Sequence, residues 1–375
     1  MKKVLSLALV GAMALSLFAC GQKTGDKKPE NSGQSGQQSE QKEQPSGDKN
    51  AAVFYYNFGD PYISTVRSAL DKAYGEKGIK PDNQDGANNQ STQSDQIQAK
   101  LGAGTNLAVV NIVNTAAEDT ALNIVDQAKQ KNIPLIFFNR EVTDKTVKAY
   151  DKCVFVGTDA AEAGHMQGKM IGEYLVANYD KVDLNKDGKI SYVMFMGEEG
   201  NNEATYRTKY GVEDANEVLK KAGKPELEFY DAKNDKKYLV DPDGKWSAQA
   251  STDYMSTILS QYSVDKNNMV ELIICNNDEM AIGAVNALNN VGFNNGDESK
   301  TIPVFGVDAT ESAKELIKAK KMVGTIKQDA EGMAKAIADI SANLLDGKQP
   351  FEGLQLQVDK EVNKVRIPYQ IYTGE

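Results

Sequence analysis

Short apolar runs alternate with longer amphipathic segments between residues 52 and 345. The runs are rich in Val, Ile and Phe and lack the polar–apolar alternation of a strand with one solvated face. Such runs predict strands that are covered on both faces, as in a parallel sheet, and the segments between them predict crossover helices. The sequence therefore predicts an α/β protein with doubly wound parallel sheets.

The predicted elements divide into two halves that look alike in plan. In each half an apolar strand is followed by Asn, at Asn139 and at Asn277. In such sheets ligands bind beyond the carboxyl ends of the strands, so two facing sheets would form a polar cleft. The predicted strands cover residues 52–56, 107–112, 134–139, 154–157, 190–196, 228–231, 272–276, 304–307 and 323–326. The predicted helices cover residues 62–77, 91–102, 117–131, 161–178, 202–222, 247–261, 278–290, 312–319 and 330–345.

The N-terminal region has a different composition. A basic start is followed by an apolar run at 4–18, which is too short for a membrane span, and by Leu-Phe-Ala-Cys ending at Cys20. This pattern resembles a bacterial lipobox, so residues 1–20 are predicted to be a lipoprotein signal peptide with Cys20 as the lipidation site. The alternative is an ordinary secretory signal with an incidental Cys. Residues 21–50, rich in Gly, Gln, Ser, Lys and Glu, are predicted to be a disordered linker.

These segments predict an exported protein that is anchored by lipid on the outer face of the cytoplasmic membrane, with no other membrane contact. The remaining chain of roughly 325 residues is enough for two domains. The net charge of −10 argues against a nucleic-acid partner. Cys153 and Cys275 lie in apolar strand-like runs, which predicts buried free thiols.

Residues 183–191 look like the first half of a calcium loop. Oxygen-bearing side chains occupy loop positions one, three and five, at Asp183, Asn185 and Asp187, and Lys189 offers a carbonyl at position seven. Position twelve should be a bidentate Glu, but it is Met194. Either the loop is a solvated Asp-Gly turn, or a carboxylate from elsewhere in the chain completes a calcium site.

Several further motifs, taken in their order along the chain, are informative together. They are Tyr56-Asn-Phe-Gly-Asp60-Pro-Tyr62, Phe137-Phe-Asn139-Arg-Glu141, Val156-Gly-Thr-Asp159, Cys275-Asn-Asn277-Asp278-Glu-Met and Val304-Phe-Gly-Val-Asp308-Ala. With the loop at 183–188, they resemble the galactose/glucose-binding proteins of bacterial ABC uptake systems, in the type I periplasmic binding protein family. The resemblance runs from about Val53 to Tyr369.

The resemblance implies two domains joined by a three-crossing hinge, with the ligand in the cleft between them. The implied N-terminal domain comprises residues 51–157 plus 329–362, and the C-terminal domain comprises 158–328 plus 363–375. The crossings would lie near Thr158, Asp329 and Asn363.

The resemblance also implies which residues contact the sugar. The implied residues of the N-terminal domain are Asp60, Tyr62 and Asn139. Those of the C-terminal domain and its border are Asn201, Glu203, Arg207, Trp246, Asn277, Asp308 and Gln328. Asn201, Glu203 and Gln328 stand where the family carries His, Asp and Asn. With these departures a hexose-like ligand is still expected. Another aldose or a polyol is the alternative ligand.

Most of these residues also have a purely structural interpretation. Asp60 could cap a helix, Tyr62 could be packing, and Asn139 could serve a turn. Glu203 and Arg207 are four residues apart and could form a surface ion pair. Trp246 lies in a loop that begins a helix, which favours an exposed ring.

The resemblance completes the calcium loop with Glu271. The implied ligand set is Asp183, Asn185, Asp187, the Lys189 carbonyl, Ser191 and Glu271, with Ser191 in place of a family Gln. Glu271 begins the strand that leads to Asn277, about six residues at 3.3 Å each, or roughly 20 Å away. Calcium is therefore expected to be structural and remote from the sugar.

The sequence as a whole predicts a receptor and not an enzyme. It would bind a monosaccharide, glucose or galactose first, and deliver it to the membrane subunits of an ABC permease, with a chemoreceptor as a second partner. A monomer is expected. The alternatives are an exported sugar sensor for a histidine kinase and a sugar-active hydrolase built on paired carboxylates.

Overall fold

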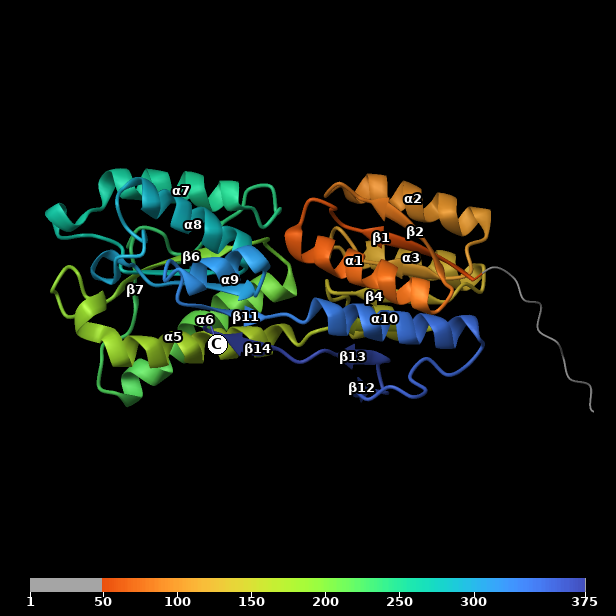
Figure 1. The fold of residues 1–375 in the computed structure, drawn as a ribbon. Helices are drawn as coiled ribbons and strands as arrows, with labels where there is room; N and C mark the ends of the chain where they lie inside the picture. The colour runs from red at the N-terminus through yellow and green to blue at the C-terminus, as the bar shows by residue number, and fades with distance from the viewer. Residues whose placement is uncertain (1–48, 375) are drawn as a thin grey trace, which may run out of the picture. The chain divides into compact units, whose positions relative to one another are not determined.

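The computed structural model describes residues 49–374, and these form two α/β lobes (Figure 1). The first lobe contains β1 (Asn50–Tyr55), α1 (Pro61–Glu76), β2 (Lys80–Asp85), α2 (Gln90–Ala103), β3 (Ala108–Val110), α3 (Glu118–Gln130), β4 (Leu135–Phe138), α4 (Asp144–Lys148), β5 (Cys153–Gly157), α10 (Ala330–Leu345), β12 (Gln357–Asp359) and β13 (Lys364–Arg366).

The second lobe is built from the middle of the chain and its last strand. It contains α5 (Ala160–Val182), β6 (Ser191–Met196), α6 (Asn202–Lys221), β7 (Glu228–Phe229), β8 (Leu239–Val240), α7 (Ala248–Gln261), β9 (Leu272–Cys275), α8 (Asp278–Asn290), β10 (Val304–Asp308), α9 (Glu311–Lys318), β11 (Gly324–Lys327) and β14 (Gln370–Tyr372). Short 3-10 turns occur at Val264–Lys266 and Glu298–Lys300.

Both sheets have the same strand order. The first runs β2-β1-β3-β4-β5 and continues to β13 and β12, and the second runs β7-β6-β9-β10-β11 and continues to β14. The pairs are parallel except β12 with β13 and β14 with β11. This order reverses beside β1 and beside β6, where doubly wound sheets place their ligands at the carboxyl ends of the strands.

Each sheet is covered on both faces by apolar helix surfaces. In the first lobe, α1 and α10 lie side by side over one face, while α2 and α3 cover the other (Figure 1). In the second lobe, α7, α8 and α9 cover one face, and α5 and α6 cover the other. Both faces of a strand such as β4 are therefore buried, as its uninterrupted apolar sequence predicts.

Three helix starts bring polar residues to the strand ends. The side chains of Asp60, Asn201 and Asn277 accept backbone N–H groups at the N-termini of α1, α6 and α8. Asp and Asn are favoured at this position because the first N–H groups of a helix have no partner within the helix. Local capping thus fixes where three of the predicted site residues lie.

Every strand and helix predicted from the sequence has a counterpart, and the sequence analysis missed several short elements. The missed strand β2 reads Lys-Pro-Asp-Asn-Gln-Asp, and no residue in it is buried. It is an edge strand that pairs only with β1, so it has no apolar pattern to reveal it.

The predicted third crossing is too early in the chain. We predicted a boundary near Asn363, but Lys364–Arg366 form β13, which pairs with β5 in the first sheet. The chain therefore crosses after Arg366, before β14 joins the second sheet at Gln370. The segment was hard to place because β13 is only three residues long and its partners in register are 209 residues earlier in the chain.

The described residues exclude the predicted signal peptide with Cys20 and almost all of the linker at 21–50. Within the described part, no helix is long and apolar enough to cross a membrane. Cys153 and Cys275 are free and buried, which confirms that prediction.

Candidate ligand-binding cleft

One cavity collects all ten predicted sugar-site residues from both lobes. Its empty volume is about 380 Å³, which includes space open to solvent. Three residues that the sequence analysis did not assign also line it. The lining consists of Tyr56, Asp60, Tyr62, Ile63, Asn139, Arg140, Asn201, Glu203, Arg207, Trp246, Asn277, Asp308 and Gln328.

On the first lobe, Asp60 is both a helix cap and a cavity residue. Its Oδ1 accepts the backbone N–H of Ile63 at 2.9 Å, and its Oδ2 accepts the Tyr56 hydroxyl. Asp60 therefore does cap the helix, but this role does not exclude a position in the cavity. The carboxylate is held in place by two donors and still faces the cavity.

Asn139 and Tyr62 also combine structural and cavity positions. Asn139 follows β4 with a φ of 60°, a left-handed conformation that Asn tolerates, and its Oδ1 accepts from Asn111 Nδ2 at 3.1 Å. Tyr62 is buried, and its hydroxyl lies 3.9 Å from Met333 Sδ. Asn139 is therefore held by a contact within its own lobe, and the Tyr62 hydroxyl contacts α10 of that lobe.

On the second lobe, Glu203 and Arg207 lie on one face of α6, but they are not a surface pair. They are 5% and 3% exposed. Burial raises the pKa of Glu203, against the lowering effect of Arg207. Both carboxylate oxygens of Glu203 lack a hydrogen-bond partner among the described residues, and so does the Nε of Arg207. These buried polar atoms are therefore not satisfied by the described part of the chain.

The other nitrogens of Arg207 are engaged by the protein. Nη1 donates to the Asn276 carbonyl at 3.0 Å, and Nη2 donates to Gln328 Oε1 and the Tyr369 hydroxyl, both at 2.9 Å. The guanidinium group is planar and rigid, so these bonds fix the direction of Nε. Gln328 Nε2 has no partner within the described part of the chain.

Trp246 corrects one expectation. We expected an exposed ring, but the residue is only 7% exposed, and its ring packs against Gly197, where an added Cβ would lie 2.1 Å from the ring. Its Nε1 lacks a partner in residues 49–374. Asn277 caps α8 through Oδ1 and donates from Nδ2 to the Trp246 carbonyl at 3.1 Å, so it also holds the loop.

Asp308 ends β10 with a φ of 126°, a strained value for a residue other than glycine. Burial raises the pKa of its carboxyl well above the ordinary value, while Arg207 lowers it and Asp278 raises it further. Strained, buried and charged residues of this kind cluster at functional sites.

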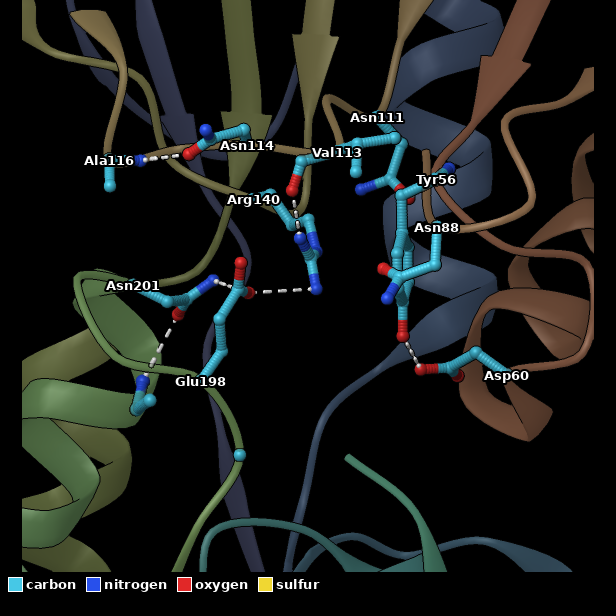
Figure 2. Close-up of polar contacts among 12 residues, drawn as sticks. Tyr56, Asp60, Asn88, Asn111, Val113, Asn114, Ala116, Arg140, Glu198 and Asn201 are labelled. Carbon is cyan, nitrogen blue, oxygen red and sulfur yellow. Dashed lines mark hydrogen bonds and ion pairs between the residues drawn. The ribbon is translucent and has the colours of Figure 1, made fainter. Parts of the chain in front are cut away.

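Figure 2 shows polar contacts between residues of the two lobes. Arg140, from the first lobe, stacks over the Tyr56 ring at 3.7 Å and forms an ion pair with Glu198 of the second lobe at 3.0 Å. Glu198 also accepts from Asn201 Nδ2 at 3.3 Å. The ion pair therefore links groups that line the cavity on both sides.

In the predicted calcium loop, some of the predicted ligand atoms lack partners and others are bonded within the protein. Asp183 Oδ1 is buried without a partner among the described residues, while Oδ2 accepts the N–H of Gly188. Glu271 is buried, accepts the N–H groups of Asn185 and Ser191 at 2.9 Å, and has its pKa raised by burial and by nearby Asp183.

The remaining predicted ligands point less clearly to a cation. Both atoms of the Asn185 amide are bonded to the backbone of Met269, at 2.9 Å each. Lys189 donates its N–H to Asp187 Oδ1. The described residues contain no group of three or more His, Cys, Asp or Glu side chains that could hold a metal ion.

The sequence analysis missed Tyr56, Ile63 and Arg140 as cavity residues. Arg140 directly follows Asn139, beyond the carboxyl end of β4, and Tyr56 directly follows β1. The strand-end rule could therefore have found both. No local signal marks Glu198, because its role depends on the partner lobe.

Two similarly wound lobes and one polar cavity at their strand ends define a two-lobed solute-binding protein. The chain belongs to the periplasmic binding protein family, whose domain matches residues 51–349. The predicted family and fold class are thereby confirmed.

Relatives and solved structures agree with this assignment. The chain is 37% identical over 323 residues to the D-galactose/methyl-galactoside binding periplasmic protein MglB of Haemophilus influenzae, covering 86% of this chain and 88% of the relative. It is 27% identical over 317 residues to a putative rhizopine-binding protein of Rhizobium meliloti, covering 84% and 87%. These relatives are solute-binding proteins and not enzymes.

A similar fold occurs in an ABC transporter solute-binding protein from Clostridium phytofermentans solved with bound beta-D-glucose. The TM-score is 0.67 at 19% identity, with 87% of this chain and 94% of that chain covered.

Proposed function

We propose that this protein is a lipid-anchored receptor on the outer face of the cytoplasmic membrane. It captures a monosaccharide, galactose or glucose first, by closing its two lobes, and delivers the sugar to an ABC permease. The closed form would present the surface that the permease, and a chemoreceptor where one exists, recognises. The family supports export and transport, and the 37% identical relative supports galactose.

The set of unpartnered polar atoms around the cavity carries this proposal. Two are acceptors, the oxygens of Glu203, and three are donors: Arg207 Nε, Trp246 Nε1 and Gln328 Nε2. Each sugar hydroxyl both donates and accepts, so one sugar can serve both kinds of group. A buried polar atom without a partner costs about 1–3 kcal/mol, so a polyhydroxylated ligand is favoured strongly.

Fluorescence of the single Trp246 provides the test. The purified protein is titrated with galactose, glucose, xylose, ribose and myo-inositol, and each mixture is checked for new products. We expect saturation with galactose or glucose at the lowest concentration and an unchanged sugar afterwards. Saturation by myo-inositol alone would replace the hexose with a polyol, and failure of every compound to change fluorescence or melting temperature would refute the proposal.

We also propose a structural calcium ion at the loop, held by Asp183, Asn185, Asp187, the Lys189 carbonyl, Ser191 and Glu271. The buried Asp183 and Glu271 carboxylates support it, because Asp183 Oδ1 has no hydrogen-bond partner among the described residues. Calcium prefers such oxygen ligands. Asn185 would have to exchange its bonds to Met269 for the ion.

A chelator distinguishes calcium from a closed, metal-free loop. At calcium 100-fold above its Kd, the folded protein gains about 2.7 kcal/mol. We expect EGTA to lower the melting temperature of the wild type and to have little effect on Glu271→Gln. Because Glu271 and Asn277 flank opposite ends of β9, sugar affinity should change little. If EGTA leaves the melting temperature of the wild type unchanged, the proposed calcium ion is ruled out.

A further inference from the structure

Three short segments connect the lobes, and any change in the angle between the lobes must occur in them. They lie between β5 and α5, between β11 and α10, and between β13 and β14. Their central residues include Thr158, Gln328 and Tyr369, whose side chains are all buried. Contacts among these three side chains therefore report directly on the geometry of the hinge.

The hydroxyl of Tyr369 meets a side chain from each of the other two crossings. It lies 2.7 Å from Thr158 Oγ1 and 3.4 Å from Gln328 Oε1. It also accepts from Arg207 Nη2 at 2.9 Å. A single hydroxyl can satisfy all three by accepting from Arg207 and Thr158 and donating to Gln328.

Tyr369 does not line the cavity, whereas Arg207 and Gln328 do. Arg207 Nη2 divides its bonds between Tyr369 and Gln328, and its free Nε belongs to the same rigid plane. Movement of Tyr369 relative to the other crossings would therefore rotate the guanidinium group. Tyr369 therefore does not line the cavity itself, but it fixes the orientation of Arg207, which does.

We propose that Tyr369 is a positioning residue, whose hydroxyl connects the three crossings in the observed arrangement of the lobes and thereby orients Arg207 toward the ligand. This inference rests on the proposed function for its ligand. It predicts that one buried hydroxyl outside the cavity controls affinity, because its bonds with Thr158 and Gln328 depend on the hinge angle.

Tyr369→Phe tests the proposal because it removes the hydroxyl and retains the ring. The matched control is Tyr74→Phe, which removes a buried hydroxyl that bonds to Ser341 at 2.8 Å within the first lobe. For galactose binding followed by Trp246 fluorescence, we expect Tyr369→Phe to raise Kd about 10-fold, mainly through faster dissociation. Tyr74→Phe should lower the melting temperature and leave Kd within about twofold.

Thr158→Val gives a second, independent variant. It removes a hydroxyl that touches Tyr369 but no cavity residue that the structure records. We expect it to weaken binding as well, and the double variant with Tyr369→Phe to be no weaker than the stronger single variant, since both break one network. Additive losses would show that the two hydroxyls act separately and would overturn the proposal.

Hydrogen exchange without sugar separates this proposal from the sugar assignment. We expect Tyr369→Phe, and not Tyr74→Phe, to speed amide exchange at 158–160 and 328–330. If wild type binds no sugar, the proposed function fails, and the exchange result still decides the role of Tyr369 in the hinge. If wild type binds sugar and Tyr369→Phe leaves both Kd and exchange unchanged, only the positioning role is refuted.

Discussion

The two lobes present different kinds of polar groups to the same cavity. On the first lobe, each oxygen of Asp60 already accepts a bond, and Asn139 accepts from Asn111. On the second lobe, Glu203 and the Nε of Arg207 lack partners in the described part of the chain. The first lobe is thus a preorganised surface, while the second carries most of the polar groups that a ligand must satisfy.

This difference follows from where the residues lie. Asp60 begins α1, so its carboxylate is shared between the helix terminus and the cavity. Glu203 lies inside the first turn of α6, whose cap is supplied by Asn201. Its carboxylate does not cap the helix, and both of its oxygens lack a hydrogen-bond partner among the described residues. The comparison predicts that equivalent changes cost more binding energy on the second lobe.

A matched pair of amide substitutions tests the comparison most directly. Glu203→Gln and Asp60→Asn both replace one carboxylate oxygen by an NH2 group. We expect Glu203→Gln to raise the sugar Kd on the order of 100-fold, because two bonds to a charged acceptor are weakened. Asp60→Asn should raise it about 10-fold, because Oδ1 can still cap the helix. Equal losses, measured by titration, would contradict the difference between the lobes.

The ion pair across the cleft should have a smaller effect. Arg140 and Glu198 have side chains that are 5% and 20% exposed, and Glu198→Gln would leave the charge of Arg140 without its partner. We expect the sugar Kd to rise about fivefold, with faster dissociation in stopped-flow measurements, since breaking a buried ion pair is destabilising.

Glu199→Gln is the control for this prediction. Glu199 is the next residue, and its ion pair with Lys236 is exposed, at 50% and 62% for the two side chains. Exposed pairs contribute little, so its Kd should stay within about twofold of wild type. A similar change in both variants would mean that loop charge in general, and not the contact between lobes, affects binding.

The smallest expected effect on sugar binding concerns a buried acid behind the second-lobe surface, whose titration affects stability instead. Burial raises the pKa of Asp278 to about 7, although hydrogen bonds from Thr325 and Thr310 lower it. An Asp in an unfolded chain has a pKa of about 3.9. Between these values the folded protein binds a proton that the unfolded chain does not, so this contribution to stability is lost as pH rises through about 7.

Asp278→Asn removes this titration while keeping a group of the same size. We expect the melting temperature of the variant, relative to wild type, to increase between pH 5 and pH 8. Paired melting curves at each pH provide the measurement. A difference that stays constant over this range would show that Asp278 does not titrate there.

The sequence predicted the core of each lobe well, because the signal is local. Apolar runs such as β4 and β9 are buried on both faces, and a local cap fixes Asp60 and Asn277 at helix starts. The resemblance to a known family then selected ten residues that the structure brings to one cavity. Missing from the prediction were the polar edge strand β2 and the ion pair between Arg140 and Glu198.

The sequence alone thus determined the lobes, the strand ends and the types of polar residue near the cavity. It could not decide that Trp246 is buried, or that β13 belongs to the first sheet. Nor could it bring Tyr369 to Thr158, 211 residues earlier. Periodicity and capping report on neighbours within about one helical turn, whereas these contacts exist only after three distant crossings converge. The hinge cluster is therefore a property of the tertiary structure.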